Sequence, residues 1–239
     1  MPLIFACIAP HAGDLIPETI ADQNIVAPTR KSMYAMGSTL ESLKPETVVI
    51  INPHGFRVQG VLSVSVAERA TAYWASDVKL DFEMDPTIAN AIADKATEMN
   101  VPVVKYIYGA SSGPECFVPL DWGAVVPLYF MGHRFTPKPK IVHCSPMRTL
   151  PLATHYEFGR AIGRVLKESD KRIAFIASAD QGHAHDANGP YGYDPASAKY
   201  DAWMQDVIRN GNLDELLNAD PQLVEDGKPD SLWPTTVLA

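Results

Sequence analysis

The segment Leu3–Ala9, with the sequence LIFACIA, leads directly into the pair Pro10-His11, and this stretch decides the fold. Its residues are all apolar, which is typical of a short strand covered on both faces of a sheet. The same pattern recurs at residues 47–52, TVVIIN, which lead into a second Pro-His pair, Pro53-His54. We therefore expect two buried strands, each with a histidine just beyond its carboxyl end.

Further strands and helices alternate along the chain outside these two segments. Apolar runs at residues 61–66, 140–144 and 172–178 also indicate strands. Apolar residues at helical spacing favour helices at the following ranges: 32–43, 86–99, 155–167 and 196–209. This alternation predicts an α/β fold, a single domain over residues 1–239 with a central, largely parallel or mixed sheet flanked by helices.

Two proline-containing stretches, 127–139 and 190–195, are expected to be long loops. The last residues, 229–239, stop within an apolar pattern without a helix stop signal, so the chain is expected to be a fragment.

The composition excludes several classes of protein. The chain has 239 residues and a formal charge of −8, and its Lys and Arg residues form no run, which argues against binding to nucleic acid. The longest apolar run, residues 122–131, is about half of the roughly 20 residues that span a bilayer, so no membrane insertion is expected. The amino terminus has no basic region before its apolar stretch, which argues against a signal peptide. Three widely spaced cysteines form no C-x-x-C pattern, and they fit a reducing, cytoplasmic location.

A third apolar strand, ending at Ser178, is followed by Asp180, His183 and His185. In an open parallel sheet, ligands bind beyond the carboxyl ends of the strands, so the segments that carry His11, His54 and these residues are expected to converge. The proline before each of the first two histidines restricts the local backbone and helps to fix the ring direction.

Two imidazoles and one carboxylate on one face of a metal form the facial triad of non-haem Fe(II) oxygenases, which leaves positions open for substrate and O₂. A turn histidine without a ligand is the ordinary interpretation of a lone Pro-His pair. The recurrence of the Pro-His pair at two strand ends favours metal ligation by His11 and His54.

Several motifs together resemble the class III extradiol ring-cleavage dioxygenases, the superfamily of the catalytic B subunit of protocatechuate 4,5-dioxygenase. The motifs are Ala9-Pro10-His11, Asn52-Pro53-His54-Gly55, Asp121-Trp122-Gly123 with the following Val-Pro-Leu, Ser178-Ala179-Asp180-Gln181-Gly182-His183, and Tyr191-Gly192-Tyr193-Asp194-Pro195. The resemblance extends over nearly the whole chain. Many relatives carry Asp-His-Gly where this chain has Asp-Trp-Gly, and family chains normally continue past the final residues here, so the family's C-terminal end is expected to be missing.

The resemblance implies that His11 and His54 bind the metal and that His183 is the catalytic acid and base, with His185 as the alternative. The family's remaining ligand is a carboxylate near the C-terminus, for which Asp230, three residues before Trp233, and Glu225 are the two candidates. Solvated acidic residues are the ordinary interpretation of such a cluster.

The roles expected for other polar and aromatic residues are less specific. Tyr191 and Tyr193 are candidates to line an aromatic substrate pocket, and Trp122 to form a stacking wall, although burial in the core is the expectation for Trp122. Asp180 is expected either to orient a histidine or to cap its loop. Of the remaining histidines, His143 and His155 are expected to be packed in a strand and exposed at a helix start, respectively, whereas His133 is a weak candidate for the site.

The function that the resemblance implies is Fe(II)-dependent extradiol cleavage of a catechol or aminophenol by O₂, with Zn²⁺ or Mn²⁺ as alternative metals. The alternatives are a non-catalytic metal-binding or scaffold member of the superfamily and a zinc-dependent relative acting on dihydroxyphenylalanine-like substrates. A homo-oligomer is expected from the frequency of oligomers, and a small partner subunit is a further possibility.

Overall fold

The computed structural model describes residues 2–19, 24–74 and 78–239. Six strands form the central sheet, in the order β1 (Leu3–Ala9), β10 (Ile173–Ser178), β2 (Thr47–Ile51), β9 (Lys140–Ser145), β3 (Leu62–Ser65) and β6 (Val103–Tyr106). The first four strands run parallel, β3 is antiparallel to β9, and β6 is parallel to β3. The predicted α/β fold with a mixed, mainly parallel sheet is confirmed.

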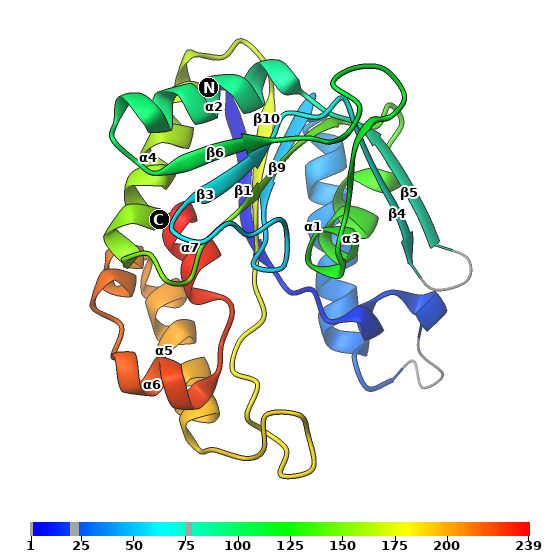
Figure 1. Ribbon diagram of the computed structural model, residues 1–239. Coiled ribbons are helices and arrows are strands. Elements are labelled where there is room, and N and C mark those ends of the chain that lie inside the picture. The colour runs from blue at the N-terminus through cyan, green and yellow to red at the C-terminus, as the bar shows by residue number, and fades with distance from the viewer. Residues whose placement is uncertain (1, 20–23, 75–77) are drawn as a thin grey trace.

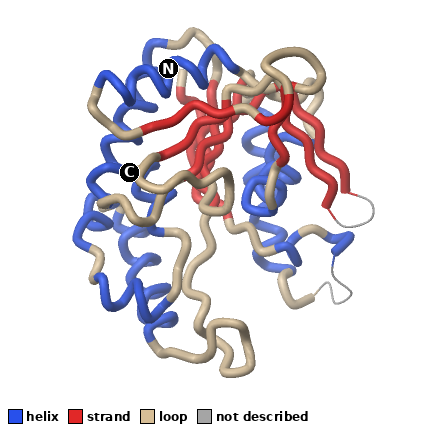
Figure 2. The backbone as a smooth tube through the Cα atoms, viewed as in Figure 1, coloured by secondary structure: helices blue, strands red, loops and turns tan. Residues whose placement is uncertain are grey.

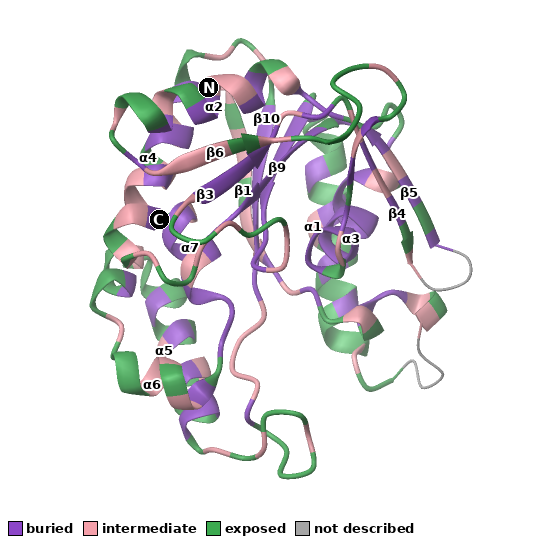
Figure 3. Cartoon of the chain, in the orientation of Figure 1, coloured by how far each residue is buried: buried purple, intermediate pink, exposed green. Residues whose placement is uncertain are grey.

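The central strands are buried on both faces. Successive side chains point to opposite sides of the sheet, and a hydrophobic core lies on each side. In β2, Val48 and Ile50 join one hydrophobic core, whereas Val49 and Ile51 join the other. Figure 3 shows these strands as the most completely buried part of the molecule. This two-sided burial explains why the predicted strands are continuously apolar.

Helices cover both faces of this sheet (Figure 1). On one side lie α2 (Pro86–Glu98), α4 (Leu152–Glu168) and α7 (Leu232–Leu238), and on the other lie α1 (Ala27–Ser42) and α3 (Trp122–Leu128). A smaller core around the buried Tyr200 joins α5 (Ala196–Asn210) to α6 (Pro221–Gly227). Short helical turns lie at Gly13–Leu15, Pro17–Thr19, Tyr129–His133 and Leu213–Asn218. Within the described residues, no helix is both long and apolar enough to cross a bilayer.

A second sheet, which the sequence patterns did not predict, lies beside α3 (Figure 2). Its strand order is β5 (Val78–Glu83), β4 (Arg69–Trp74), β8 (Cys116–Pro119) and β7 (Tyr108–Gly109). These strands are short, and polar or exposed residues alternate with buried ones along β4 and β5. The apolar runs that mark the central strands are therefore absent from them.

Two local expectations were wrong. The stretch 127–139 does not begin as a loop, because Pro127 lies inside α3 and a helical turn follows at Tyr129–His133. His155 is fully buried rather than exposed. Since α4 begins three residues before His155, this residue lies on the same helix face as Phe158 and Ile162, which pack against the sheet.

Candidate metal centre

The candidate metal centre lies at the carboxyl ends of β1, β10 and β2, which are neighbours in the sheet. His11 follows β1, His54 follows β2, and Asp230 precedes α7. The His11 and His54 Nε2 atoms are 3.0 Å apart, and they lie 3.2 and 3.0 Å from the Asp230 Oδ2 atom. The predicted convergence of the strand ends is confirmed, and it brings together three atoms that could ligate a metal ion.

A buried hydroxyl fixes the orientation of the His11 ring. The Ser178 Oγ atom donates its proton to the Gly123 carbonyl and lies 2.9 Å from the His11 Nδ1 atom. Because the hydroxyl proton is already used, the His11 Nδ1–H must be the donor in that contact. With the proton on Nδ1, a neutral His11 has its Nε2 lone pair free for a metal ion, whereas a protonated His11 donates from Nε2 to the Asp230 Oδ2 atom.

The Gly123 carbonyl is available to Ser178 because of a proline. In an α-helix this carbonyl would accept a hydrogen bond from the backbone nitrogen four residues later, but that residue is Pro127, which has no N–H. Gly123 also lies close to the centre, since a Cβ atom there would be 2.9 Å from the Asn52 Oδ1 and 3.1 Å from the His54 Cδ2. The start of α3 thus fits tightly against the two strand ends.

Two aspartates connect the segments around His11. The Asp180 Oδ1 atom accepts a 2.8 Å hydrogen bond from the His11 backbone nitrogen, so this carboxylate holds the backbone of the candidate ligand. The Asp180 backbone nitrogen in turn donates to the Asp230 Oδ1 atom, at 2.9 Å, which leaves Oδ2 directed at the histidines. Asp230 is only 2% exposed, and its orientation is fixed from both sides.

His54 is held by a second buried chain of hydrogen bonds. Its backbone nitrogen donates to the Asn52 Oδ1 atom at 2.9 Å, and the Asn52 Nδ2 atom donates to the His143 Nε2 atom at 2.6 Å. The His143 Nδ1 atom lies 3.0 Å from the Tyr106 hydroxyl. His143 is therefore the packed, hydrogen-bonded residue that its place in a strand predicted.

Trp122 stacks on His54, with ring centroids 4.3 Å apart and an angle of 30° between the planes. Its side chain is 42% exposed, so the expectation that it is buried in the core was wrong. The reason is its position as the first residue of α3, where it lies at the rim of the centre while the following residues enter the core.

The charges around the centre favour a bound cation. Burial lowers the pKa of His11, but the Asp230 hydrogen bond and the carboxylates of Asp180, Asp230 and Asp121 outweigh it, and the net pKa lies above its ordinary value. Burial raises the pKa of Asp230, but the hydrogen bonds from His11 and His54 outweigh it and hold this pKa well below its usual range. A buried carboxylate facing two imidazole nitrogens is a donor set that suits Fe²⁺, Zn²⁺ or Mn²⁺.

The two histidines after β10 have different partners. The His183 Nδ1 atom is 2.8 Å from the Lys228 carbonyl, and its Nε2 atom is 3.9 Å from the Asp230 Oδ2 atom. The His185 Nε2 atom instead lies 3.0 Å from the Asp201 Oδ2 atom. His183 is therefore at the edge of the centre, whereas His185 is tied to α5.

The predicted substrate tyrosines lie in the loop that follows these histidines. The ring of Tyr191 meets the ring of His183 edge to face, with centroids 5.2 Å apart, and Tyr191 is exposed. Tyr193 is also exposed and pairs with His185 through an isolated bridge between the two ends of the loop. Their roles as substrate contacts stay predictions.

Glu225, the alternative carboxylate, is outside the cluster. It lies on α6, where its exposed side chain pairs with Lys228 at 2.7 Å. His133 packs beside Tyr129 and is also outside the group of three ligand atoms. Sequence reasoning missed the roles of Ser178, Asn52 and Gly123, although all three lie within the motifs that it singled out.

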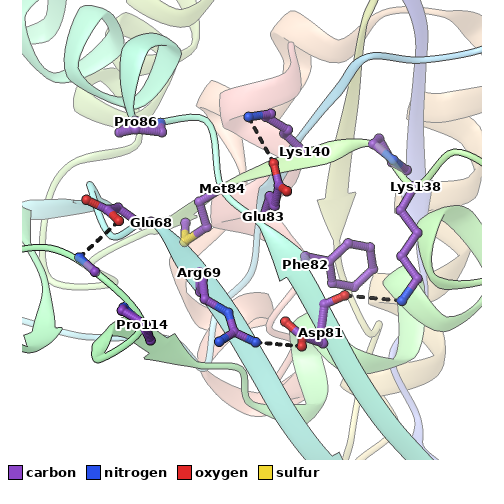
Figure 4. A pocket seen from close by; sticks show the side chains of 12 residues that line it. Glu68, Arg69, Asp81, Phe82, Glu83, Met84, Pro86, Pro114, Lys138 and Lys140 are labelled. Atoms are coloured by element: carbon purple, nitrogen blue, oxygen red, sulfur yellow. Dashed lines mark hydrogen bonds and ion pairs between the residues drawn. The ribbon is translucent and has the colours of Figure 1, made fainter.

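A cavity of about 940 Å³ lies elsewhere, between the second sheet and the segment 138–140 (Figure 4). Its charged side chains are largely paired with one another, as in Arg69 with Asp81 and Lys140 with Glu83. Lys138 donates to the Asp81 carbonyl. Since these charges satisfy each other, they do not indicate a particular ligand.

Comparisons with known proteins identify the family of the chain. Residues 6–239 match the family model of the catalytic LigB subunit of aromatic ring-opening dioxygenase. Protein CA_C1420 of Clostridium acetobutylicum is 26% identical over 222 residues, which cover 91% of this chain and 47% of that protein. The chain thus spans about half the length of this curated relative.

A solved structure has the same fold. The crystal structure of the uncharacterized protein JW3007 from Escherichia coli K12 is similar, with a TM-score of 0.61 and 17% sequence identity, over 98% of this chain and 86% of that chain. The family match covers nearly all of the sequence and includes the three converging residues. The chain belongs to the family of the catalytic LigB subunit of aromatic ring-opening dioxygenases.

Proposed function

We propose that this protein is an Fe(II)-dependent extradiol dioxygenase that opens the ring of a catechol or an aminophenol beside its hydroxyl group. The observation that carries the proposal is the convergence of the His11, His54 and Asp230 ligand atoms within 3.0–3.2 Å. Family membership supports the reaction class. In this proposal the three residues hold the metal, and Ser178 fixes the tautomer of His11.

When bound, Fe(II) would supply a site where the substrate oxygens and O₂ are held together and where a hydroxyl ionises more readily. Two histidines and one carboxylate form the donor set of a facial triad, which favours iron over the alternatives. Zn²⁺ and Mn²⁺ are compatible with the same donor atoms, and metal analysis distinguishes the three.

His183 would move the substrate proton. The Lys228 carbonyl can only accept a hydrogen bond, so the His183 Nδ1 atom carries the proton in that 2.8 Å contact. A neutral His183 then has a free lone pair on Nε2, the atom that lies 3.9 Å from the Asp230 Oδ2 atom. This nitrogen is placed to take a proton from a substrate hydroxyl and to return it later, as a general base and acid.

The experiment is anaerobic reconstitution with Fe(II), followed by addition of air and a panel of catechols and aminophenols. We expect O₂ uptake and a coloured ring-opened product with at least one substrate, and neither from a His11→Ala variant. A protein that binds one iron per chain at these residues but consumes no O₂ with any substrate would favour the alternative of a non-catalytic scaffold.

A further inference from the structure

Two arginines follow strands that end at the edge of the sheet with the candidate metal centre. Arg57 lies three residues after His54, and Arg148 lies three residues after the end of β9. Since β2 and β9 are parallel neighbours, the loops after them leave the sheet at the same edge. The Gln59 Nε2 atom donates a 3.1 Å hydrogen bond to the Thr149 Oγ1 atom, which joins the two loops. The loops that carry the two arginines therefore lie side by side at this edge.

The Arg148 guanidinium lies close to the candidate metal centre. Its Cζ atom is over the Trp233 ring, 5.0 Å from the ring centroid, and Trp233 is three residues after Asp230. Partial burial lowers the pKa of Arg148, the Asp230 carboxylate raises it and the Arg57 guanidinium lowers it, and the net pKa is below its ordinary value. Arg148 is therefore within electrostatic range of both Asp230 and Arg57.

Neither of these two arginines has an acidic partner. Other arginines of the chain pair with carboxylates at 2.6–3.4 Å, namely Arg69, Arg160 and Arg172. In the part of the chain that the structure describes, Arg57 and Arg148 make no ion pair and no hydrogen bond. One exposed arginine without a partner needs no explanation, but two that lie close together repel each other. An anion bound between them would relieve that repulsion.

Asp230 does not neutralise Arg148. Its Oδ2 atom lies 3.2 and 3.0 Å from the Nε2 atoms of His11 and His54, and its Oδ1 atom accepts a hydrogen bond from the Asp180 backbone nitrogen. In the proposed metal centre Oδ2 would ligate the cation, which balances the charge of Asp230. The two arginines are then left for an anionic group on a molecule that is bound at the centre.

A carboxylate is the group that this pair of side chains suits best. The planar guanidinium presents N–H donors that match the two oxygens of a carboxylate, and such charge-assisted pairs are stronger than neutral hydrogen bonds. The contact with Trp233 restricts the Arg148 side chain, so less freedom is lost when an anion binds. Arg57 supplies a second positive charge from the neighbouring loop.

We propose that Arg57 and Arg148 bind a carboxylate group of the substrate and so select carboxylated aromatic compounds over neutral ones. The identification of that compound as the one to be opened rests on the proposed dioxygenase function. The two arginines would determine specificity and not take part in the chemistry, because they contact a substituent and not the reacting atoms. Their affinity for a carboxylate requires no turnover.

The first test measures binding of benzoate and of benzamide by ligand-observed NMR titration, with chelator-treated protein and with Zn²⁺-loaded protein. The two compounds share a ring and differ in charge, and neither can be opened beside a hydroxyl group. We expect benzoate to bind at least fivefold more tightly than benzamide in both forms of the protein. Arg148→Gln and Arg57→Gln should each reduce this preference. Arg160→Gln is the matched control, because Arg160 is an exposed arginine that pairs with Glu157 on α4.

The second test uses the Fe(II)-reconstituted protein and compares carboxylated catechols, each with its own amide. The ratio of kcat/KM for the acid to kcat/KM for the amide should fall by roughly 10- to 100-fold in Arg148→Gln, through KM more than kcat. Arg148→Lys should restore part of the ratio, since it keeps the charge without the planar fork. Arg160→Gln should leave the ratio unchanged.

Three results would overturn the proposal. The first is a preference for benzoate that persists in Arg148→Gln or appears only with Zn²⁺, because the carboxylate would then bind the metal. The second is displacement of benzoate by inorganic phosphate at equal concentration, which would identify a site for free anions. The third is turnover in which the acid and its amide react equally well. A protein that prefers benzoate through Arg148 but opens no ring would contradict only the proposed dioxygenase function.

Discussion

Removal of the Ser178 hydroxyl should weaken metal binding although Ser178 is not itself a ligand. In Ser178→Ala, the His11 Nδ1–H loses its acceptor and the Gly123 carbonyl loses its donor, and both sites are enclosed. His11 is then free to rotate and to adopt the tautomer with the proton on Nε2. Loss of such a partner typically reduces metal affinity by roughly 10- to 100-fold, which corresponds to about 1.4–2.7 kcal/mol.

The assay is competition for Fe(II) or Zn²⁺ against a chelating dye, together with urea unfolding of the metal-free protein. The free energy of unfolding should fall by about 1–3 kcal/mol, because buried polar groups lose their partners. Thr47→Val is the control, since Thr47 is equally buried and donates to Asp85, outside the group of three ligand atoms. It should lower stability without changing metal affinity. If Ser178→Ala binds metal as tightly as the unaltered protein, the argument from the His11 tautomer is refuted.

Three other predictions test separate parts of the site and the core. His183→Ala should keep the metal but lose turnover by roughly 10²- to 10⁴-fold, whereas His11→Ala should lose the metal; equal metal loss in both, measured by metal analysis, would contradict their different roles. Asp230→Asn should weaken metal binding at least tenfold, while Glu225→Gln should leave it unchanged in the same dye assay. Burial lowers the pKa of His155 to about 4, below its ordinary value of 6.5. Between these two pH values the unfolded chain therefore binds a proton at His155 that the folded protein does not bind. The contribution of His155 to the free energy of unfolding is complete above pH 6.5 and falls by about 3 kcal/mol towards pH 4, at about 1.4 kcal/mol per pH unit. A His155→Gln variant should show a correspondingly shallower pH dependence of the free energy of unfolding in urea titrations.

The central part of the fold was predictable because its strands are buried on both faces. Such strands are continuously apolar, as in residues 47–52 and 172–178, and the structure places strands at Thr47–Ile51 and Ile173–Ser178. The second sheet was not predictable in this way. Its strands mix buried and exposed side chains, and β7 contains only two residues, so no pattern of useful length identifies them.

The two histidines of the candidate metal centre were predictable because their position depends on a general rule. Parallel strands deliver the residues after their carboxyl ends to one edge of the sheet, and β10 lies between β1 and β2. The carboxylate was harder to identify, since Glu225 and Asp230 are close in sequence. Glu225 lies on α6 and pairs with Lys228, whereas Asp230 lies between α6 and α7 and accepts a hydrogen bond from the Asp180 backbone nitrogen.

The hydrogen-bond partners of the candidate ligands could not be inferred from the sequence alone. Ser178 reaches a carbonyl of α3 that is free because Pro127 is four residues further along the helix, and this requires knowledge of which helix packs against β10. His155 shows the same limitation on a smaller scale. The sequence predicted a helix that begins at His155, whereas α4 begins at Leu152. His155 is therefore a buried position inside the helix and not its exposed first residue.

The most direct test of the metal centre is a crystal structure of the protein soaked or grown with Fe(II) or Zn²⁺, with anomalous diffraction recorded at the absorption edge of that metal. We predict one strong anomalous peak per chain, about 2 Å from the Nε2 atoms of His11 and His54 and from a carboxylate oxygen of Asp230. A fully loaded protein whose anomalous peak lies away from these three residues would contradict the account.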